Sequence, residues 1–371
     1  MVIDPDDPSH LVAAGAAAGG VWHTRAGGPP GWHPANPPGA GYASRRARRL
    51  LWVEHPSEGR SLVVQVEAVD GDAGQALYRV AWAKLREGPT KALAVAGQPL
   101  AVATDPHRGR RGRIAALVLG GGGGSLAYSD DAGDRWRRFH PSGRCHLTQA
   151  LAFGSDRHLW MASLGSVPGS KASQADTTTL MRMTQALADG EEPPGDGPQL
   201  DLLREPALLA IHPDRGEVTE RLALPTAAHS ISVHPDLKGI AWLGGRQGLM
   251  RLHAGRVRSV PLQTTTDRAL EPPLELAGIT LFPDPVSGTE QLFVALTGEP
   301  PARRGIWLGQ RQDGQWRFER VSEGASKGFP DLPAGPVTVS PEHQLAVVPY
   351  GTHGIRRSHA LGALGTWAPV Q

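Results

Sequence analysis

Residues 100–136 read LAVATDPHRGRRGRIAALVLGGGGGSLAYSDDAGDRW, and this stretch contains the pattern that decides the fold. Short apolar runs are separated first by an Asp-Pro turn and then by a run of glycines. Apolar runs of this length between turn residues favour buried β-strands over helices. The glycines at 120–124 lack the Lys-Ser/Thr end of a phosphate-binding loop. We therefore predict three antiparallel strands joined by tight turns.

The same order of apolar run, turn, apolar run, gap and apolar run recurs along the whole chain. The spacing is about 50 residues, apart from one longer interval in the middle. That period fits the blades of a β-propeller better than a shorter solenoid repeat. The first turn of each copy aligns at Pro5, Pro56, Pro106, Ser155, Pro235, Pro283 and Pro341.

A weaker fourth strand follows each set of three, as in WRRFHP at 136–141 and WRFERV at 316–321. We therefore predict an all-β fold, a seven-bladed β-propeller of four-stranded antiparallel blades, with residues 1–371 forming a single domain. Closing the ring protects strand edges that an open sheet would expose. The chain begins on an innermost strand and ends on an outermost one, so we expect little strand exchange at closure.

The turn after the third strand of the third copy contains the most specific motif. Its sequence, SDDAGDRW, resembles the Asp box, S-x-D-x-G-x-x-W, of BNR-repeat, sialidase-like β-propellers. Three partial copies occur: one begins at Thr24, one ends at Trp316 and one begins at Ser358. Sialidases, sortilin-type receptors and a photosystem II assembly factor have similar propellers. The resemblance implies a structural role, on the face away from the active site, for the box residues Ser129, Asp131, Gly133 and Trp136.

Composition excludes several classes of protein. The net charge is only +2, and no apolar run approaches the roughly 20 residues that cross a bilayer. Cys145 is the sole cysteine, so the chain has neither an internal disulfide nor a cysteine-based zinc site. No close metal-ligand pair or cofactor motif occurs, so we expect no metal and no cofactor. The N-terminus lacks a secretory signal, and we expect a cytoplasmic protein.

The fourth blade contains an insertion at about 165–207. Its segment GEEPPGDGPQ, at 190–199, has the composition of a loop. A short helix is expected around Leu180–Leu187. An excursion of this length within a compact domain is usually functional or disordered.

The sequence does not identify a catalytic site. The resemblance to sialidases implies three arginines, a tyrosine nucleophile paired with glutamate, and an aspartate, but the Arg-Ile-Pro motif of that family is absent. Tyr350 is the sole tyrosine expected in a late loop of the site face, and no glutamate stands out as its partner. A glycoside hydrolase, sialidase-like or using two carboxylates, remains the alternative to a non-catalytic propeller.

The prediction is therefore a protein-binding or assembly propeller. The loops between second and third strands, and those joining blades, emerge on one side of the ring, where they and the insertion form the expected binding face. A glycan is an alternative partner, and nucleic acid is a weaker one suggested by the arginine clusters. The candidate residues of this face are Arg45, Arg46, Arg49, His146, His229, Arg303, Arg304, Tyr350 and His353.

Overall fold

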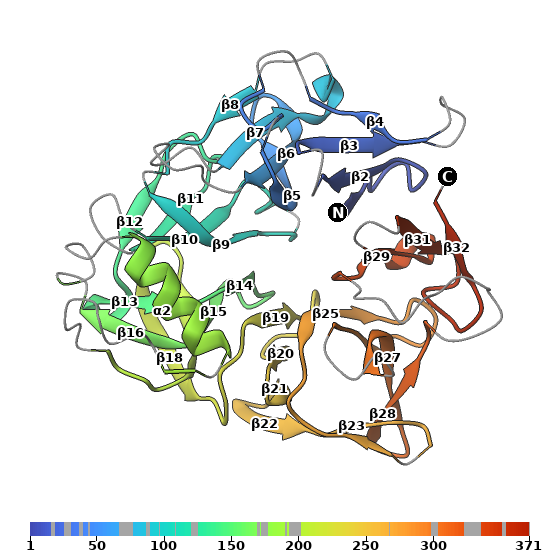
Figure 1. The fold of residues 1–371 in the computed structure, drawn as a ribbon. Helices are drawn as coiled ribbons and strands as arrows, with labels where there is room; N and C mark the ends of the chain where they lie inside the picture. Colours follow the sequence, from blue (N-terminus) through green and yellow to red (C-terminus); the bar gives the residue numbers. More distant parts are fainter. Residues whose placement is uncertain are drawn as a thin grey trace.

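Seven four-stranded antiparallel sheets follow one another around a ring in the computed structural model (Figure 1). The predicted all-β, seven-bladed fold is confirmed. The structure describes residues 1–15, 19–25, 31–36, 40–43, 45–66, 77–86, 90–95, 97–107, 109–119, 125–168, 171, 177–189, 191–192, 202–266, 268–297, 303–322, 335–350 and 354–370.

Each blade runs from an innermost strand to an outermost strand in chain order. Blade 1 comprises β1 (Val2–Ile3), β2 (Leu11–Ala14), β3 (Val21–Thr24) and β4 (His33–Pro34). Blade 2 comprises β5 (Ala47–His55), β6 (Gly59–Val66), β7 (Leu77–Ala81) and β8 (Thr90–Ala92). Blade 3 comprises β9 (Gln98–Thr104), β10 (Ile114–Leu119), β11 (Ser125–Ser129) and β12 (Arg137–Phe139).

The remaining four blades repeat this order. Blade 4 comprises β14 (Ala150–Phe153), β15 (Leu159–Ser163), β17 (Ala207–His212) and β18 (Glu217–Ala223). Blade 5 comprises β19 (Ser230–Val233), β20 (Ala241–Gly245), β21 (Gly248–His253) and β22 (Arg256–Val260). Blade 6 comprises β25 (Leu276–Pro283), β26 (Glu290–Leu296), β27 (Gly305–Gln312) and β28 (Gln315–Arg320), and blade 7 comprises β29 (Thr338–Ser340), β30 (Leu345–Pro349), β31 (Ile355–Ser358) and β32 (Trp367–Pro369).

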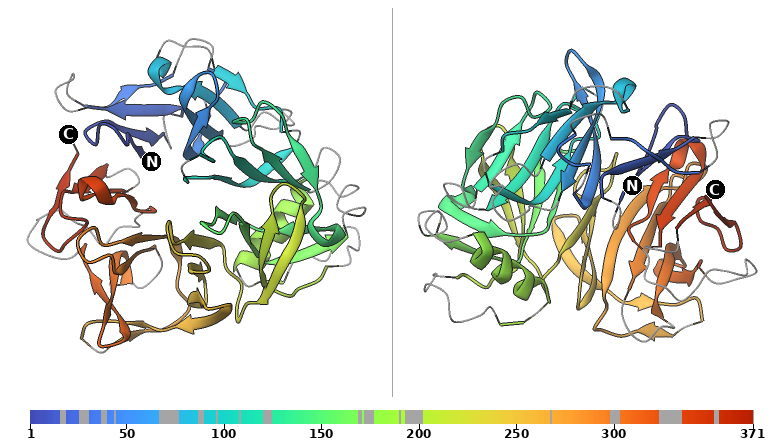
Figure 2. Two further views of the ribbon diagram at one scale, coloured as in Figure 1. Left: turned by 180° about the vertical axis from the view of Figure 1, so that it is seen from behind. Right: turned by 45° about the horizontal axis from the view of Figure 1, so that its top comes forward.

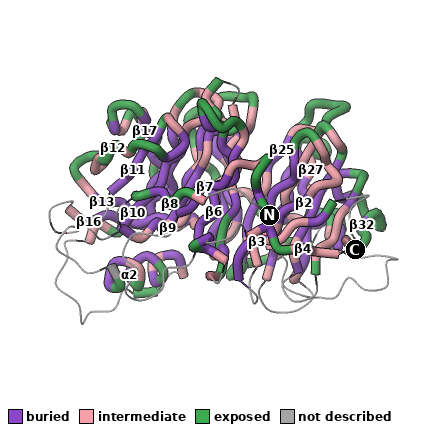
Figure 3. Tube along the Cα trace, turned by 90° about the horizontal axis from the view of Figure 1, so that it is seen from above, coloured by how far each residue is buried: buried purple, intermediate pink, exposed green. Residues whose placement is uncertain are grey.

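The core lies between the faces of neighbouring blades. Alternate side chains of a strand point to opposite faces of its sheet, so every middle strand contributes to two interfaces. Val102 of β9 packs in the interface with blade 2, whereas Ala101 and Ala103 pack in the interface with blade 4. The second strand β10 is accordingly buried along its whole length, and Figure 3 shows buried segments running through the blades.

Two described segments of the blade 4 insertion form regular secondary structure. The first residues of the insertion form β16 (Gly165–Pro168), which pairs with β13 (Arg144–Leu147), and the insertion continues into the helix α2 (Thr177–Asp189). The helix expected around Leu180–Leu187 is confirmed, whereas the strand β16 at the start of the predicted insertion was not foreseen. A second short ribbon, β23 (Leu262–Gln263) with β24 (Ala269–Leu270), links blades 5 and 6.

Blades 7 and 1 meet without exchanging a strand, as predicted. β1 pairs with β2 and β32 pairs with β31. The Thr338 hydroxyl donates to the carbonyl of Met1 at 3.1 Å, and the apolar contact joins Ile3 and Leu11 to Leu345 and Val347. Figure 2 shows blade 1 beside blade 7 from behind and at a tilt. This seam is therefore closed by side-chain packing.

Candidate functional site

The helix α2 lies on one face of the ring, in the connection between the second and third strands of blade 4. Its apolar side, with Leu180 and Met183, packs against Cys145 and Leu147 of β13 and Val167 of β16. All five side chains are buried. The helix is thus fixed to the ring, and the side view in Figure 3 places it at one edge of the molecule.

A neighbouring blade holds the carboxyl end of α2. Arg246, in the turn between β20 and β21 of blade 5, donates from Nη1 to the carbonyl oxygen of Asp189 at 2.7 Å. A cation at the carboxyl end of a helix satisfies a free carbonyl and complements the helix dipole. Since α2 also contacts β10 of blade 3, the helix links blades 3 and 5 on this face.

The outward side of α2 is polar. Thr178, Arg182 and Gln185 are exposed, and the Gln185 amide donates to the Asp189 carboxylate at 2.8 Å. The Gln149 amide, which precedes the innermost strand of blade 4, donates to the Gln185 side-chain oxygen at 3.2 Å. The helix therefore presents a positioned set of hydrogen-bonding groups to solvent.

Four of the predicted arginines lie in connections on this face. Arg45 and Arg46 join blade 1 to blade 2, and Arg46 is exposed. Arg303 and Arg304 lie in the connection from β26 to β27 and are half-buried. Arg303 donates to the carbonyl of Glu271 at 2.9 Å and so ties this connection to the preceding blade junction.

Arg49 was expected in a loop of the binding face, but it lies on a strand. It lies on β5, and its Nη1 donates to the carbonyl of Val102 on β9 at 2.8 Å, bridging the innermost strands of blades 2 and 3. Although the side chain keeps exposed area, the surrounding protein lowers its pKa. Burial, followed by repulsion from Arg49, lowers the pKa of the Met1 ammonium to about 6. Arg49 thus belongs to the inside of the ring.

Two of the predicted histidines, His146 and His229, are wholly or partly buried. His146 is buried on β13, with Nδ1 at 3.0 Å from the Ser163 hydroxyl, and burial lowers its pKa to about 4. His146 is therefore a core residue, although it was expected on the binding face. His229 is half-buried, and burial lowers its pKa while the nearby Asp189 carboxylate opposes that change. His353 lies outside the described residues.

Tyr350 is a core residue, which overturns its assignment to the binding face. Only 2% of it is exposed, and it packs with Phe293 and Trp367 between blades 6 and 7. Burial raises the pKa of its hydroxyl well above the ordinary value. A phenol held in this way is not placed to meet a ligand on the surface.

The turn between β11 and β12 lies on the face opposite α2. The Ser129 hydroxyl donates to the Asp131 carboxylate at 2.9 Å and accepts from the backbone N–H of Gly133 at 2.8 Å, while the Asp131 carboxylate accepts from the backbone N–H of Arg135 at 2.9 Å. Gly133 has a φ of 90°, a conformation that favours glycine. Trp136 packs on the interface of blades 2 and 3. A structural role for these residues remains our prediction.

Blade 7 contains a turn of the same design. The Ser358 hydroxyl accepts from the backbone N–H groups of Ala360 at 3.1 Å and Gly362 at 2.9 Å, as Ser129 does for the residues two and four positions on. Leu361 and Gly362 have positive φ, as Ala132 and Gly133 do. The serine hydroxyl thus organises the turn where no aspartate occupies the third position.

An ion cluster that the sequence did not reveal ties the Ser129 turn to blade 2. Asp134 accepts hydrogen bonds from Arg79 at 2.7 Å, Lys91 at 2.8 Å and His55 at 3.0 Å. Partial burial raises the pKa of Asp134, but these three donors outweigh burial and hold it well below its ordinary value. Arg79 is 1% exposed and also donates to the carbonyl of Ala132 at 2.7 Å.

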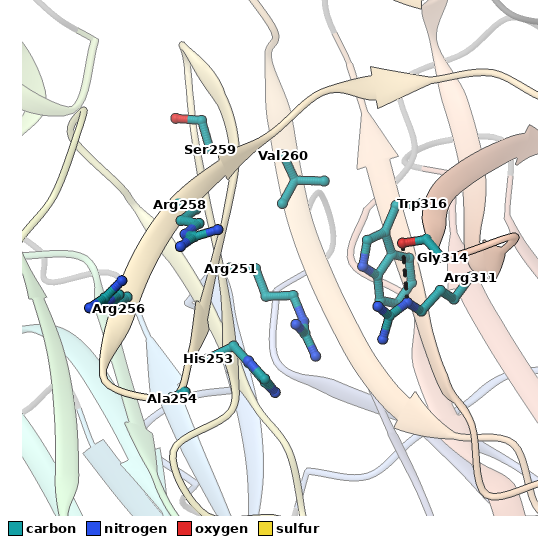
Figure 4. A pocket seen from close by; sticks show the side chains of 10 residues that line it. All are labelled: Arg251, His253, Ala254, Arg256, Arg258, Ser259, Val260, Arg311, Gly314 and Trp316. Carbon is teal, nitrogen blue, oxygen red and sulfur yellow. Dashed lines mark hydrogen bonds between the residues drawn. The ribbon is translucent and has the colours of Figure 1, made fainter.

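A second feature missed at the sequence level is a basic groove between blades 5 and 6. Arg251 and His253 enter it from β21, and Arg311 and Trp316 enter from the opposite side (Figure 4). Its volume is about 590 Å³. The only sequence signal is the spacing of cations two apart in RLHAGRVRS, at 251–259, which becomes meaningful once these residues form a hairpin.

Comparisons with known proteins identify the fold and no family. No family model and no curated protein matches the chain. The β-propeller domain of Cps50 (Swd1) from Myceliophteria thermophila matches with a TM-score of 0.54 and 12% identity over 94% of this chain and 92% of that one. Kuenenia stuttgartiensis hydrazine synthase matches with a TM-score of 0.50 and 12% identity over 82% and 75%.

YCF48 from Cyanidioschyzon merolae aligns at a TM-score of 0.49 and 12% identity over 94% of this chain and 90% of that one. At such identities a match shows the shared fold alone, because a propeller scaffold supports many unrelated functions. The chain is thus similar to other β-propellers in architecture.

Proposed function

We propose that this chain is a non-catalytic, protein-binding β-propeller whose partner surface is the face that carries α2. The observation that carries the proposal is the seating of α2 on the ring. Its apolar side is buried on β13 and β16, its end is held by Arg246, and its polar side points to solvent. A rigid scaffold with an elaborated connection on one face is a common way to present a binding site.

The polar side of α2 supports protein recognition in particular. Gln185 is positioned by Gln149 and Asp189, so its conformation is partly fixed before a partner arrives. Fixing side chains in advance lowers the entropic cost of association. Arg182, one turn away on the exposed side, adds a group that is enriched at protein interfaces.

The test is capture of a partner by tagged protein from an extract of the native host, followed by reconstitution with the purified partner. We expect Arg182→Glu with Gln185→Lys to weaken binding by tenfold or more, because a buried polar contact replaced by a mismatched charge loses more than 1.4 kcal/mol. The control is Arg215→Glu, an exposed residue in the turn between β17 and β18 on the opposite face. Equal binding by all three proteins would refute the proposed surface.

The alternative hydrolase is tested separately. Aryl glycosides, including sialosides, are incubated with the purified protein. Turnover that disappears after a single Asp or Glu substitution would contradict the non-catalytic proposal.

A further inference from the structure

The basic groove runs along the outer hairpins of blades 5 and 6 and shares no lining residue with the proposed partner surface. It is formed by the hairpin β21–β22 of blade 5 and the hairpin β27–β28 of blade 6. Arg246, which holds α2, lies at the other end of β21. At about 3.3 Å per residue, this six-residue strand places His253, at the far end of the groove, roughly 20 Å from the turn that contains Arg246.

The register of blade 5 forces its cations together. Arg251 is directly opposite Arg258, and His253 is directly opposite Arg256. These four residues share the face of the sheet that contains Val260, which packs toward blade 6. Arg251 and Arg258 are like charges directly opposite on paired strands, an arrangement that destabilises a sheet. A ligand of opposite charge would relieve this repulsion.

Few carboxylates neutralise the groove. Arg251 forms an ion pair with Glu290 of blade 6. Among the residues that the structure describes, Arg256, Arg258 and Arg311 form no ion pair, and Arg311 donates only to the carbonyl of Gly314 at 3.3 Å. Asp313 lies in the turn next to Gly314 at the rim. These three guanidiniums, which have no ion-pair partner among the described residues, thus leave the groove positively charged.

One wall of the groove is aromatic. Trp316 stands opposite Arg311 in the register of β27 and β28. Its ring contacts Trp242 edge to face, with centroids 4.7 Å apart and an interplanar angle of 85°. This contact fixes the indole, which stays half-exposed. A fixed aromatic face beside cations can stack a planar, electron-poor group.

We propose that this groove binds a nucleotide unit, with its phosphate on Arg256, Arg258 and Arg311 and its base against Trp316. Arginine forks match the oxygens of phosphate in pairs. A positively charged groove with an aromatic platform is the arrangement that binds single-stranded nucleic acid without reading its sequence. The volume of about 590 Å³ is in the range of small-molecule sites. The nucleotide has two sources, a free nucleotide or one residue of a single strand.

Fluorescence anisotropy with fluorescein-labelled dT10, and competition by ATP and UMP, distinguishes these sources. Tight binding of dT10 with weak competition by the mononucleotides indicates a single strand. Weak binding of dT10 with strong competition by the mononucleotides indicates a free nucleotide. We expect R256Q/R258Q to weaken the favoured ligand by tenfold or more and to make its binding less sensitive to salt. The control R204Q/R215Q removes the same charge from exposed arginines outside the groove and should leave affinity unchanged.

A second arm tests the stacking contact. Inorganic polyphosphate provides the charge without a base, so Trp316→Leu should weaken dT10 by several-fold and leave polyphosphate unaffected. Trp316 also contacts the core, so replacing it changes core packing as well as the groove. Arg311→Gln keeps Trp316 and therefore tests the groove without that change. Equal loss in the control variant, equal binding of poly-glutamate or heparin, or no loss in any groove variant would overturn the proposal.

Discussion

At the residue scale, the contacts of Asp134 illustrate how a turn can join two blades. Asp131 organises its own turn, since its carboxylate accepts from Ser129 and the backbone of Arg135. Asp134, three residues on, instead reaches blade 2 and neutralises the buried Arg79. Of two aspartates in one motif, Asp131 thus stabilises its own turn, whereas Asp134 binds a residue of the neighbouring blade.

These roles predict different costs of substitution. Asp131→Ala removes local hydrogen bonds and should lower the free energy of unfolding by about 1 kcal/mol. Asp134→Ala leaves Arg79 buried without its main partner and should cost about 2 kcal/mol or more, a reduced figure because Asp134 is 31% exposed. Urea denaturation measures both.

Adding Arg79→Met to Asp134→Ala should recover part of that loss, because it removes a buried charge whose remaining ion-pair partner is the half-exposed Glu58 at 3.3 Å. Equal costs for the two single aspartate variants would contradict the interblade role.

His146 predicts a loss of stability in acid. Its pKa is about 4 in the folded protein and 6.5 as an ordinary histidine, so between these pH values the unfolded chain binds more protons. The stabilisation is complete above pH 6.5 and falls by about 3 kcal/mol as the pH approaches 4. Urea denaturation from pH 7 to 4 measures this slope. His146→Gln should have a shallower slope, and an unchanged slope would disprove the assignment.

Residue types alone predicted the Ser129 turn but not its partners. The motif SDDAGDRW contains all the residues that form the turn. Arg79 is 55 positions from Asp134, and only the packing of blade 2 on blade 3 brings them together. Tyr350 shows the converse error, because a residue at the end of a strand can still point into the next interface.

At the scale of elements, the strands were predictable because each apolar run ends at a turn residue. Helix α2 was foreseen from its own composition. The ribbon of β13 and β16 was missed, because RCHL and GSVP are short and their pairing spans an entire hairpin of blade 4. The basic groove was missed for a related reason, since its cations come from strands of two blades.

The packing of α2 predicts the effect of its removal. Replacing residues 169–201 with a short Gly-Ser linker should cost about 3 kcal/mol, because Leu180 and Met183 lose their buried sites. Cys145 provides a direct readout, since its thiol is 1% exposed and burial raises its pKa to about 12.

Ellman's reagent should react with Cys145 in the shortened protein and not in the full chain. The surface variant Arg182→Gln should keep the thiol protected. Protection in the shortened protein would show that α2 is not its cover.

At the scale of the whole molecule, the seam between blades 7 and 1 differs from every other seam. Each other pair of neighbouring blades is joined by a segment of chain, whereas Leu345 and Val347 meet Ile3 and Leu11 through side chains. Among the described residues, no helix is both long and apolar enough to cross a membrane. The side-chain contacts between blades 1 and 7 are thus what close the ring at this seam.

Leu345→Ala should destabilise the protein by about 2–5 kcal/mol and release blades 1 and 7 first. Leu252→Ala, in the interface of blades 4 and 5, is a matched control with the same buried exposure of 1%. Hydrogen exchange followed by mass spectrometry should show early loss of protection in β1, β2 and β30 only for Leu345→Ala. Identical exchange patterns would indicate that the seam opens no more easily than the others.

Helix α2 is held at one end of β21, whereas the basic groove extends to the other end, and this arrangement has a further consequence. Ligands on α2 and in the groove would not compete for space, so one molecule could hold both together. Tethering on a common rigid body raises the effective concentration of each ligand toward the other, and this increases their encounter without any direct affinity between them. The propeller would then act as a bridge whose span is set by the length of a single strand.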